Sequence, residues 1–67
     1  MLKLYDVVKL RKNDEAHGVK DSYTGTIVDV LSEGEAYTVE FFDEKGETVE
    51  DALLTEYYPD DLVLVEV

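Results

Sequence analysis

The sequence predicts a single small all-β domain over residues 1–67. Three observations indicate this class. Short runs of Val, Leu, Ile, Tyr and Phe alternate with polar residues, as in strands with one buried face. Glycines and acidic turn residues separate most of these runs. No window of about ten residues shows the apolar repeat of an amphipathic helix, so no α-helix is expected.

Five runs are expected to form strands, over residues 4–10, 26–32, 36–42, 47–54 and 62–67. The third run is the most regular, because Tyr37, Val39 and Phe41 alternate with polar residues. In the first run, Leu4 lies on the same face as Val8. The core is expected to contain Val8, Leu10, Val28, Val30, Tyr37, Val39, Phe41, Leu53 and Leu62.

The connections between the runs contain residues that favour turns. The first connection is a long polar loop over residues 11–23. Gly34 fits a tight turn after the second run, and Asp43–Gly46 fits a type I turn after the third. Tyr58–Asp61 fits one turn of helix before the last strand, because Pro59 presets the backbone φ.

The fourth run breaks its own alternation. If Val49 points inward, the charged side chain of Asp51 points inward as well. A β-bulge at Glu50 and Asp51 would reset the inner face and return Leu53 to the core. The sequence therefore predicts a bulged strand here, with two carboxylates displayed at the bulge.

These elements together predict a small SH3-like barrel of five short strands, with a long first loop and a one-turn 3-10 helix before the last strand. Closing the sheet lets so short a chain bury a core and limits its free edges. A five-stranded OB-fold is the competing architecture. It usually has a helix between its third and fourth strands, and the chain has no room for one there.

Charge is distributed unevenly along the chain. The chain carries 17 Asp and Glu against 6 Lys and Arg, a formal net charge of −11. Residues 1–22 hold five bases and four acids, whereas residues 23–67 hold one base and thirteen acids. Such an acidic surface has two interpretations: it keeps a small protein soluble by self-repulsion, or it steers association with a basic partner.

The residue content gives little support for catalysis, and no catalytic residue is assigned. His17 is the single His, and it would have to meet Ser22 or Ser32 in a supported pocket to activate a nucleophile. The absence of Cys excludes disulfides and thiolate zinc sites within this chain. Exposed pairs such as Glu50–Asp51 and Asp60–Asp61 would hold a divalent cation only loosely, so no metal and no cofactor are expected.

Several other ligand classes fit this chain poorly. Nucleic-acid binding relies on Lys and Arg, and the loop bases Arg11, Lys12 and Lys20 are offset by neighbouring acids. The chain has no Trp with which to build a polyproline groove. No apolar run approaches the roughly 20 residues of a membrane helix. Asp6 interrupts any signal-peptide pattern, so a cytoplasmic protein without membrane contact is expected.

A set of turn glycines, apolar positions and a closing turn runs through most of the chain: Leu4–Val8, Gly18, Gly25–Val28, Tyr37–Phe41, Asp43, Gly46, Leu53–Thr55 and Pro59–Leu62. In these positions the chain resembles a family of short, acidic bacterial proteins of unknown function. The resemblance implies an SH3-like barrel. Genes of that family often lie beside genes for toxin-like domains, which implies an immunity or antitoxin role. The resemblance supplies no active-site residues.

The expected function is that of a non-enzymatic, acidic protein-binding module. It would be an immunity protein or antitoxin-like inhibitor that occludes a basic, toxin-like or nuclease-like partner, and would itself be a monomer or weak dimer. The alternative is a small adaptor subunit of a larger complex. The residues expected to bind the partner are Asp43, Glu44, Glu47, Glu50, Asp51, Glu56, Tyr57, Tyr58, Asp60 and Asp61.

Overall fold

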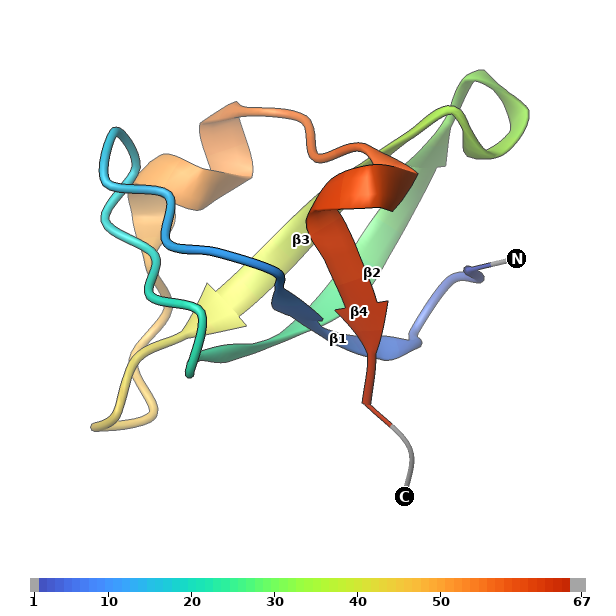
Figure 1. The fold of residues 1–67 in the computed structure, drawn as a ribbon. Helices are drawn as coiled ribbons and strands as arrows, with labels where there is room; N and C mark the ends of the chain where they lie inside the picture. The colour runs from blue at the N-terminus through green and yellow to red at the C-terminus, as the bar shows by residue number, and fades with distance from the viewer. Residues whose placement is uncertain (1, 66–67) are drawn as a thin grey trace.

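The computed structural model describes residues 2–65, and over these residues the chain is all-β. Its four strands are β1 (Val7–Leu10), β2 (Thr24–Leu31), β3 (Ala36–Phe42) and β4 (Leu62–Leu64). Three 3-10 helices accompany them: η1 (Ser32–Gly34), η2 (Glu50–Leu54) and η3 (Pro59–Asp61). The strands form an antiparallel sheet in the order β3-β2-β1-β4, which stays open over the described residues (Figure 1). The all-β prediction is confirmed, whereas the five expected strands are four.

The first strand begins later than predicted, at Val7. Before it, the backbone N–H of Lys3 donates to Asp6 Oδ2 at 2.8 Å, and Tyr5 takes a positive φ of 70°. This turn leaves Leu4 on the surface rather than on the inner face. β1 pairs with β2 on one side and with β4 on the other, where Leu10 lies opposite Leu62.

A bulge in β2 changes which of its residues face the core. Ile27 pairs with Val39, but the next paired residue is Asp29, so Val28 has no partner of its own on β3. The extra residue resets the alternation. Ile27 is therefore fully buried, whereas the predicted core residue Val28 is 39% exposed. Beyond the bulge Val30 returns toward the core and is half-buried.

The core forms one cluster under the sheet. The three residues predicted from the alternation in β3, Tyr37, Val39 and Phe41, are all buried. Gly25 lies opposite Phe41, and a Cβ built on this glycine would come within 2.7 Å of the Phe41 ring. The absent side chain at residue 25 therefore makes room for the largest apolar ring of the core. Further predicted core residues that are buried are Val8, Leu10 and Leu62.

The predicted fourth strand is wrong for most of its length. Thr48 forms one bridge to Phe42, and the N–H of Val49 donates to the Phe41 carbonyl at 2.9 Å. The chain then turns into η2, which buries Ala52 completely and leaves Leu53 38% exposed. A 3-10 helix has about three residues per turn, so one small side chain can face the core while the charged residues beside it face solvent. The helix, rather than a bulge, resolves the conflict at Asp51.

The single helical turn before the last strand is confirmed as η3. Pro59 opens it, and the N–H of Tyr58 donates to Asp61 Oδ2 at 3.0 Å. Leu62 then enters β4 and is buried. Residues 66–67 of the predicted last strand lie outside the described residues. Within residues 2–65, no helix has the length and apolar character needed to cross a membrane.

Candidate functional site

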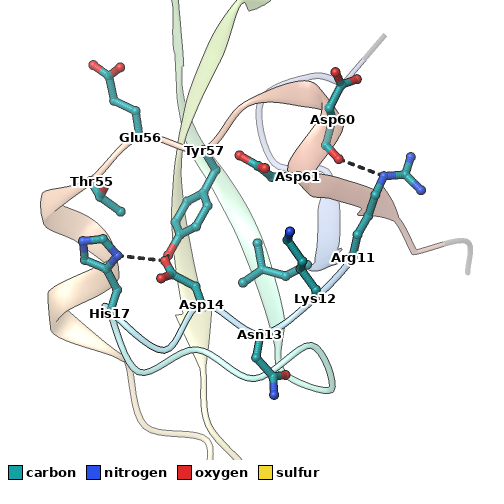
Figure 2. A pocket seen from close by; sticks show the side chains of 11 residues that line it. Arg11, Lys12, Asn13, Asp14, His17, Thr55, Glu56, Tyr57, Asp60 and Asp61 are labelled. Atoms are coloured by element: carbon teal, nitrogen blue, oxygen red, sulfur yellow. Dashed lines mark hydrogen bonds and ion pairs between the residues drawn. The ribbon is translucent and has the colours of Figure 1, made fainter.

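A pocket of about 600 Å³, lined mostly by polar and charged residues, lies between the long loop and the segment that carries η3 (Figure 2). One wall comes from residues 10–14 and 17, and the other from residues 55–57 and 60–61. Segments far apart in the sequence therefore meet there. We refer to this cavity as the polar pocket.

Tyr57 lies at the base of the polar pocket. Its backbone exchanges hydrogen bonds of 2.7 and 2.8 Å with Tyr37 on the free edge of β3. Its ring packs edge-on against Phe41, with centroids 5.3 Å apart and planes at 80°. The residue is only 4% exposed, and its hydroxyl donates to Asp14 Oδ2 at 2.7 Å. Tyr57 thus joins the hydrophobic core to the long loop.

Asp14 accepts from two side chains through the same oxygen. Besides Tyr57, His17 Nδ1 lies 2.8 Å from Oδ2, and because the acceptor is a carboxylate, Nδ1 carries the hydrogen. Asp14 and Val19 also exchange backbone hydrogen bonds that close a small hairpin, with Gly18 at φ 73° in its turn. The loop is therefore folded around this carboxylate.

The hydrogen bonds change the acidity of both partners. Burial acts to raise the pKa of Asp14, but the hydrogen bonds from Tyr57 and His17 and the charge of His17 outweigh it, so this pKa lies below its ordinary value. Burial raises the pKa of the Tyr57 hydroxyl, and the nearby carboxylates of Asp14 and Asp61 raise it further. Tyr57 is therefore a hydrogen-bond donor, and Asp14 an ionised acceptor, throughout the neutral pH range.

The opposite end of the polar pocket carries two cations. Arg11 Nε donates to the backbone carbonyl of Asp60 at 2.9 Å, and the Arg11 backbone N–H donates to the carbonyl of Asp61. Lys12 points into the space between these residues and Asp14 (Figure 2). Both signs of charge thus line the pocket, and its hydrogen bonds hold the long loop against η3.

A family model for a domain of unknown function, DUF4926, matches residues 4–59. The chain belongs to the DUF4926 family. The matched region contains β1, β2, β3, η2 and all but two residues of the polar pocket's lining, Asp60 and Asp61. The predicted membership of a family of unknown function is thereby confirmed. Comparisons with curated proteins and with solved structures gave no match.

The residues predicted to bind a partner lie on separate segments of the DUF4926 domain. The turn after β3 carries Asp43, Glu44 and Glu47, and Figure 1 shows it well apart from η3, which carries Asp60 and Asp61. Glu50 and Asp51 open η2, and residues 56–58 connect η2 to η3. Only Glu56, Tyr57, Asp60 and Asp61 of the ten come together in the polar pocket. Tyr57 is buried in the core and is therefore not available as the partner-binding residue predicted from the sequence. Tyr58 is 55% exposed.

The turn after β3 has the predicted geometry. Asp43 Oδ1 accepts from the N–H groups of Lys45 and Glu47 at 2.9 and 3.0 Å, and Gly46 takes a φ of 80°. Burial raises the pKa of Tyr23 beside this turn, and the carboxylates of Glu44 and Asp43 raise it further. The turn therefore presents its carboxylates next to an aromatic ring.

Sequence reasoning missed two features of the surface. The cluster of Asp14, His17 and Tyr57 leaves no local signal, because Tyr57 lies 43 positions from Asp14 in the chain. Leu54 was placed in a strand, but η2 turns it outward and leaves it 86% exposed. A period of three in residues 49–52, with Val49 and Ala52 inward, is the signal that would have identified η2.

Proposed function

We propose that this DUF4926 domain is a non-enzymatic protein-binding module that occludes a basic partner protein, as an immunity protein or antitoxin-like inhibitor does. It acts in the cytoplasm without nucleic acid, membrane or cofactor. In this role the polar pocket has a structural part, because its hydrogen bonds hold the long loop against the core. The carboxylates outside the pocket remain free to contact a partner.

The observation that carries the proposal is the state of the carboxylates. Among residues 2–65, the single ion pair joins His17 to Asp14. The acids of η2 and of the turn after β3 have no cation within ion-pair distance in this part of the chain, and Glu44, Glu47, Glu50 and Asp51 are exposed. Unpaired surface charge of one sign speeds encounter with a surface of the opposite sign.

The finer architecture is also part of the proposal. We infer an SH3-like barrel whose fifth strand is replaced by the segment from Thr48 to Tyr57. Two features support this: the strand order β3-β2-β1-β4 with one helical turn before β4, and the two bridges, Phe42–Thr48 and Tyr37–Tyr57, along the free edge of β3. This segment covers part of the free edge of β3 and so limits the edge to which a strand of another molecule could pair.

The test begins with a partner captured on the immobilised domain at low salt and identified by mass spectrometry. The purified partner should be basic, and its association rate should fall steeply as salt rises, because exposed charges are screened beyond roughly 8 Å at physiological ionic strength. Loss of the partner's activity in the complex supports inhibition, and retained activity supports the adaptor role. A partner without excess positive charge, or an association rate that ignores salt, would overturn the proposal.

A further inference from the structure

The most exposed large apolar side chains of η2 stand next to each other. Leu54 is 86% exposed and Leu53 is 38% exposed, whereas Ala52 on the opposite side of the same helix is completely buried. Other exposed leucines, such as Leu4, are no more than about half exposed. An adjacent pair displayed in this way leaves apolar surface in water that burial against a partner would remove.

The position of these leucines is fixed by the scaffold. The Val49 N–H donates to the Phe41 carbonyl at 2.9 Å, and the Ala52 N–H donates to the Val49 carbonyl at 3.2 Å. Ala52 is part of the core cluster beneath β3. Because η2 is held at both its start and its buried side, the leucines are presented without an ordering step, and preorganisation of this kind lowers the cost of binding.

Carboxylates flank the leucine pair on η2. Glu50 and Asp51 open this helix, and both are exposed. In the described chain neither of them has a cation within ion-pair distance. An apolar centre with a polar rim is the usual anatomy of a protein interface. The sign of the rim then specifies the partner.

We propose that Leu54, with Leu53 beside it, inserts into an apolar pocket of the partner protein whose rim carries Lys or Arg. This inference rests on the proposed function and goes further, because it places the contact on η2 and not on the tyrosines or the polar pocket. A second copy of the chain is the wrong occupant, since it would bring the carboxylates of two molecules, each with a net charge of −11, against one another.

The experiment uses defined probes in place of an unidentified partner. An isotope-labelled domain is titrated at low salt with a helical lysine–leucine peptide, and amide shifts are followed by NMR. Two matched peptides serve as references: lysine–glutamine, with equal charge and no apolar face, and glutamate–leucine, with the opposite charge. The lysine–leucine peptide should bind more tightly than either reference, with its largest shifts at Ala52–Leu54.

Variants locate the contact. Leu54→Ser should weaken binding of the lysine–leucine peptide about tenfold, since the lost burial of one leucine corresponds to roughly a factor of ten in affinity. Leu4→Ser, which removes another exposed leucine from the segment before β1, should leave affinity unchanged. Figure 1 shows this segment on the other side of the molecule from η2. The pair Glu50→Gln and Asp51→Asn should weaken binding more than the matched pair of exposed acids in and directly after η1, Glu33→Gln and Glu35→Gln.

Each outcome separates the two proposals. Equal binding of the lysine–leucine and lysine–glutamine peptides, unaffected by Leu54→Ser, would overturn the η2 contact while the acidic attraction stands. Failure of both cationic peptides to bind would overturn the proposed function and this inference together. Equal binding of the glutamate–leucine peptide would show that charge does not select the partner. A dimer in sedimentation that Leu54→Ser dissolves would assign the leucines to a second copy.

Discussion

The polar pocket, one wall of which directly follows η2 in the chain, and η2 itself use their charged groups in opposite ways. In the pocket, Asp14 is satisfied by Tyr57 and His17, and Arg11 is satisfied by the Asp60 carbonyl. On η2, Glu50 and Asp51 have no such partner. Charges that are already hydrogen-bonded within the fold stabilise it, whereas charges left free are available to another molecule. The hydrogen-bonded charges of the pocket therefore contribute to stability, and the free carboxylates of η2 are the ones proposed to meet a partner.

The largest expected effect comes from the ring beneath the pocket. Phe41→Ala should lower the free energy of unfolding by about 3–5 kcal/mol, because the ring is completely buried against Tyr57 and Gly25. The core of a domain below about 70–80 residues rarely supplies more than about 3–5 kcal/mol of stability, so the variant should retain little of it. Urea denaturation followed by circular dichroism measures this. Phe42→Ala, at a half-buried position, is the matched control, and an equal loss there would contradict the assignment of the inner face.

The hydrogen bond at the base of the pocket should have the next largest effect. Tyr57→Phe keeps the ring but removes the donor to Asp14, and should cost about 1.5–3 kcal/mol, the usual range for a hydrogen bond to a charged group. The same denaturation assay applies. Tyr58→Phe removes an exposed hydroxyl from the adjacent residue and should change nothing. Equal effects of the two substitutions would show that the bond to Asp14 does not stabilise the fold.

Acidity provides a third test of the pocket. Because folding lowers the pKa of Asp14, its contribution to stability is present above its ordinary value of 3.8 and is lost as the pH falls through the lower folded pKa. The stability difference between the parent and Asp14→Asn should therefore shrink in acid. Acid also protonates the other carboxylates and weakens their mutual repulsion, but this change affects the parent and the variant equally. It therefore cancels in the difference between their free energies of unfolding. A difference that is independent of pH would place Asp14 outside the stabilising network.

The smallest effect on stability is expected on η2. Leu54→Ser should change the free energy of unfolding by less than about 0.5 kcal/mol, because the side chain is 86% exposed. Ala52→Ser, two residues earlier and fully buried, should destabilise the domain clearly. Thermal unfolding of both variants checks this contrast. A marked loss with Leu54→Ser would mean that the leucine supports the fold rather than a partner.

The sequence predicted those parts of the fold that depend on neighbouring residues. The alternation of Tyr37, Val39 and Phe41 identified β3, and Pro59 identified η3. The bulge at Val28 was not visible, because alternation in a single strand does not show how its partner is registered.

The candidate site was less predictable than the strands. The carboxylates of η2 were recognised, but their setting on a helix depends on one small residue, Ala52, fitting under β3. The cluster of Asp14, His17 and Tyr57 forms only when the long loop meets the segment before η3. Such contacts are set by tertiary packing, which no local pattern records.

The pairing of Leu10 with Leu62 has a consequence for the order of events in time. β2 and β3 are joined by a short connection and can form a hairpin as soon as both exist, and β1 can then pair with β2. The other edge of β1 must wait for β4, a strand from the other end of the described chain. Pairings between distant parts of a chain form slowly, because closing the long loop costs conformational entropy before any contact stabilises the pairing. A nascent chain that stops before η3 would hold β1, β2 and β3 but would lack Leu62 of the core, and translation would have to pass β4 before the sheet could be completed.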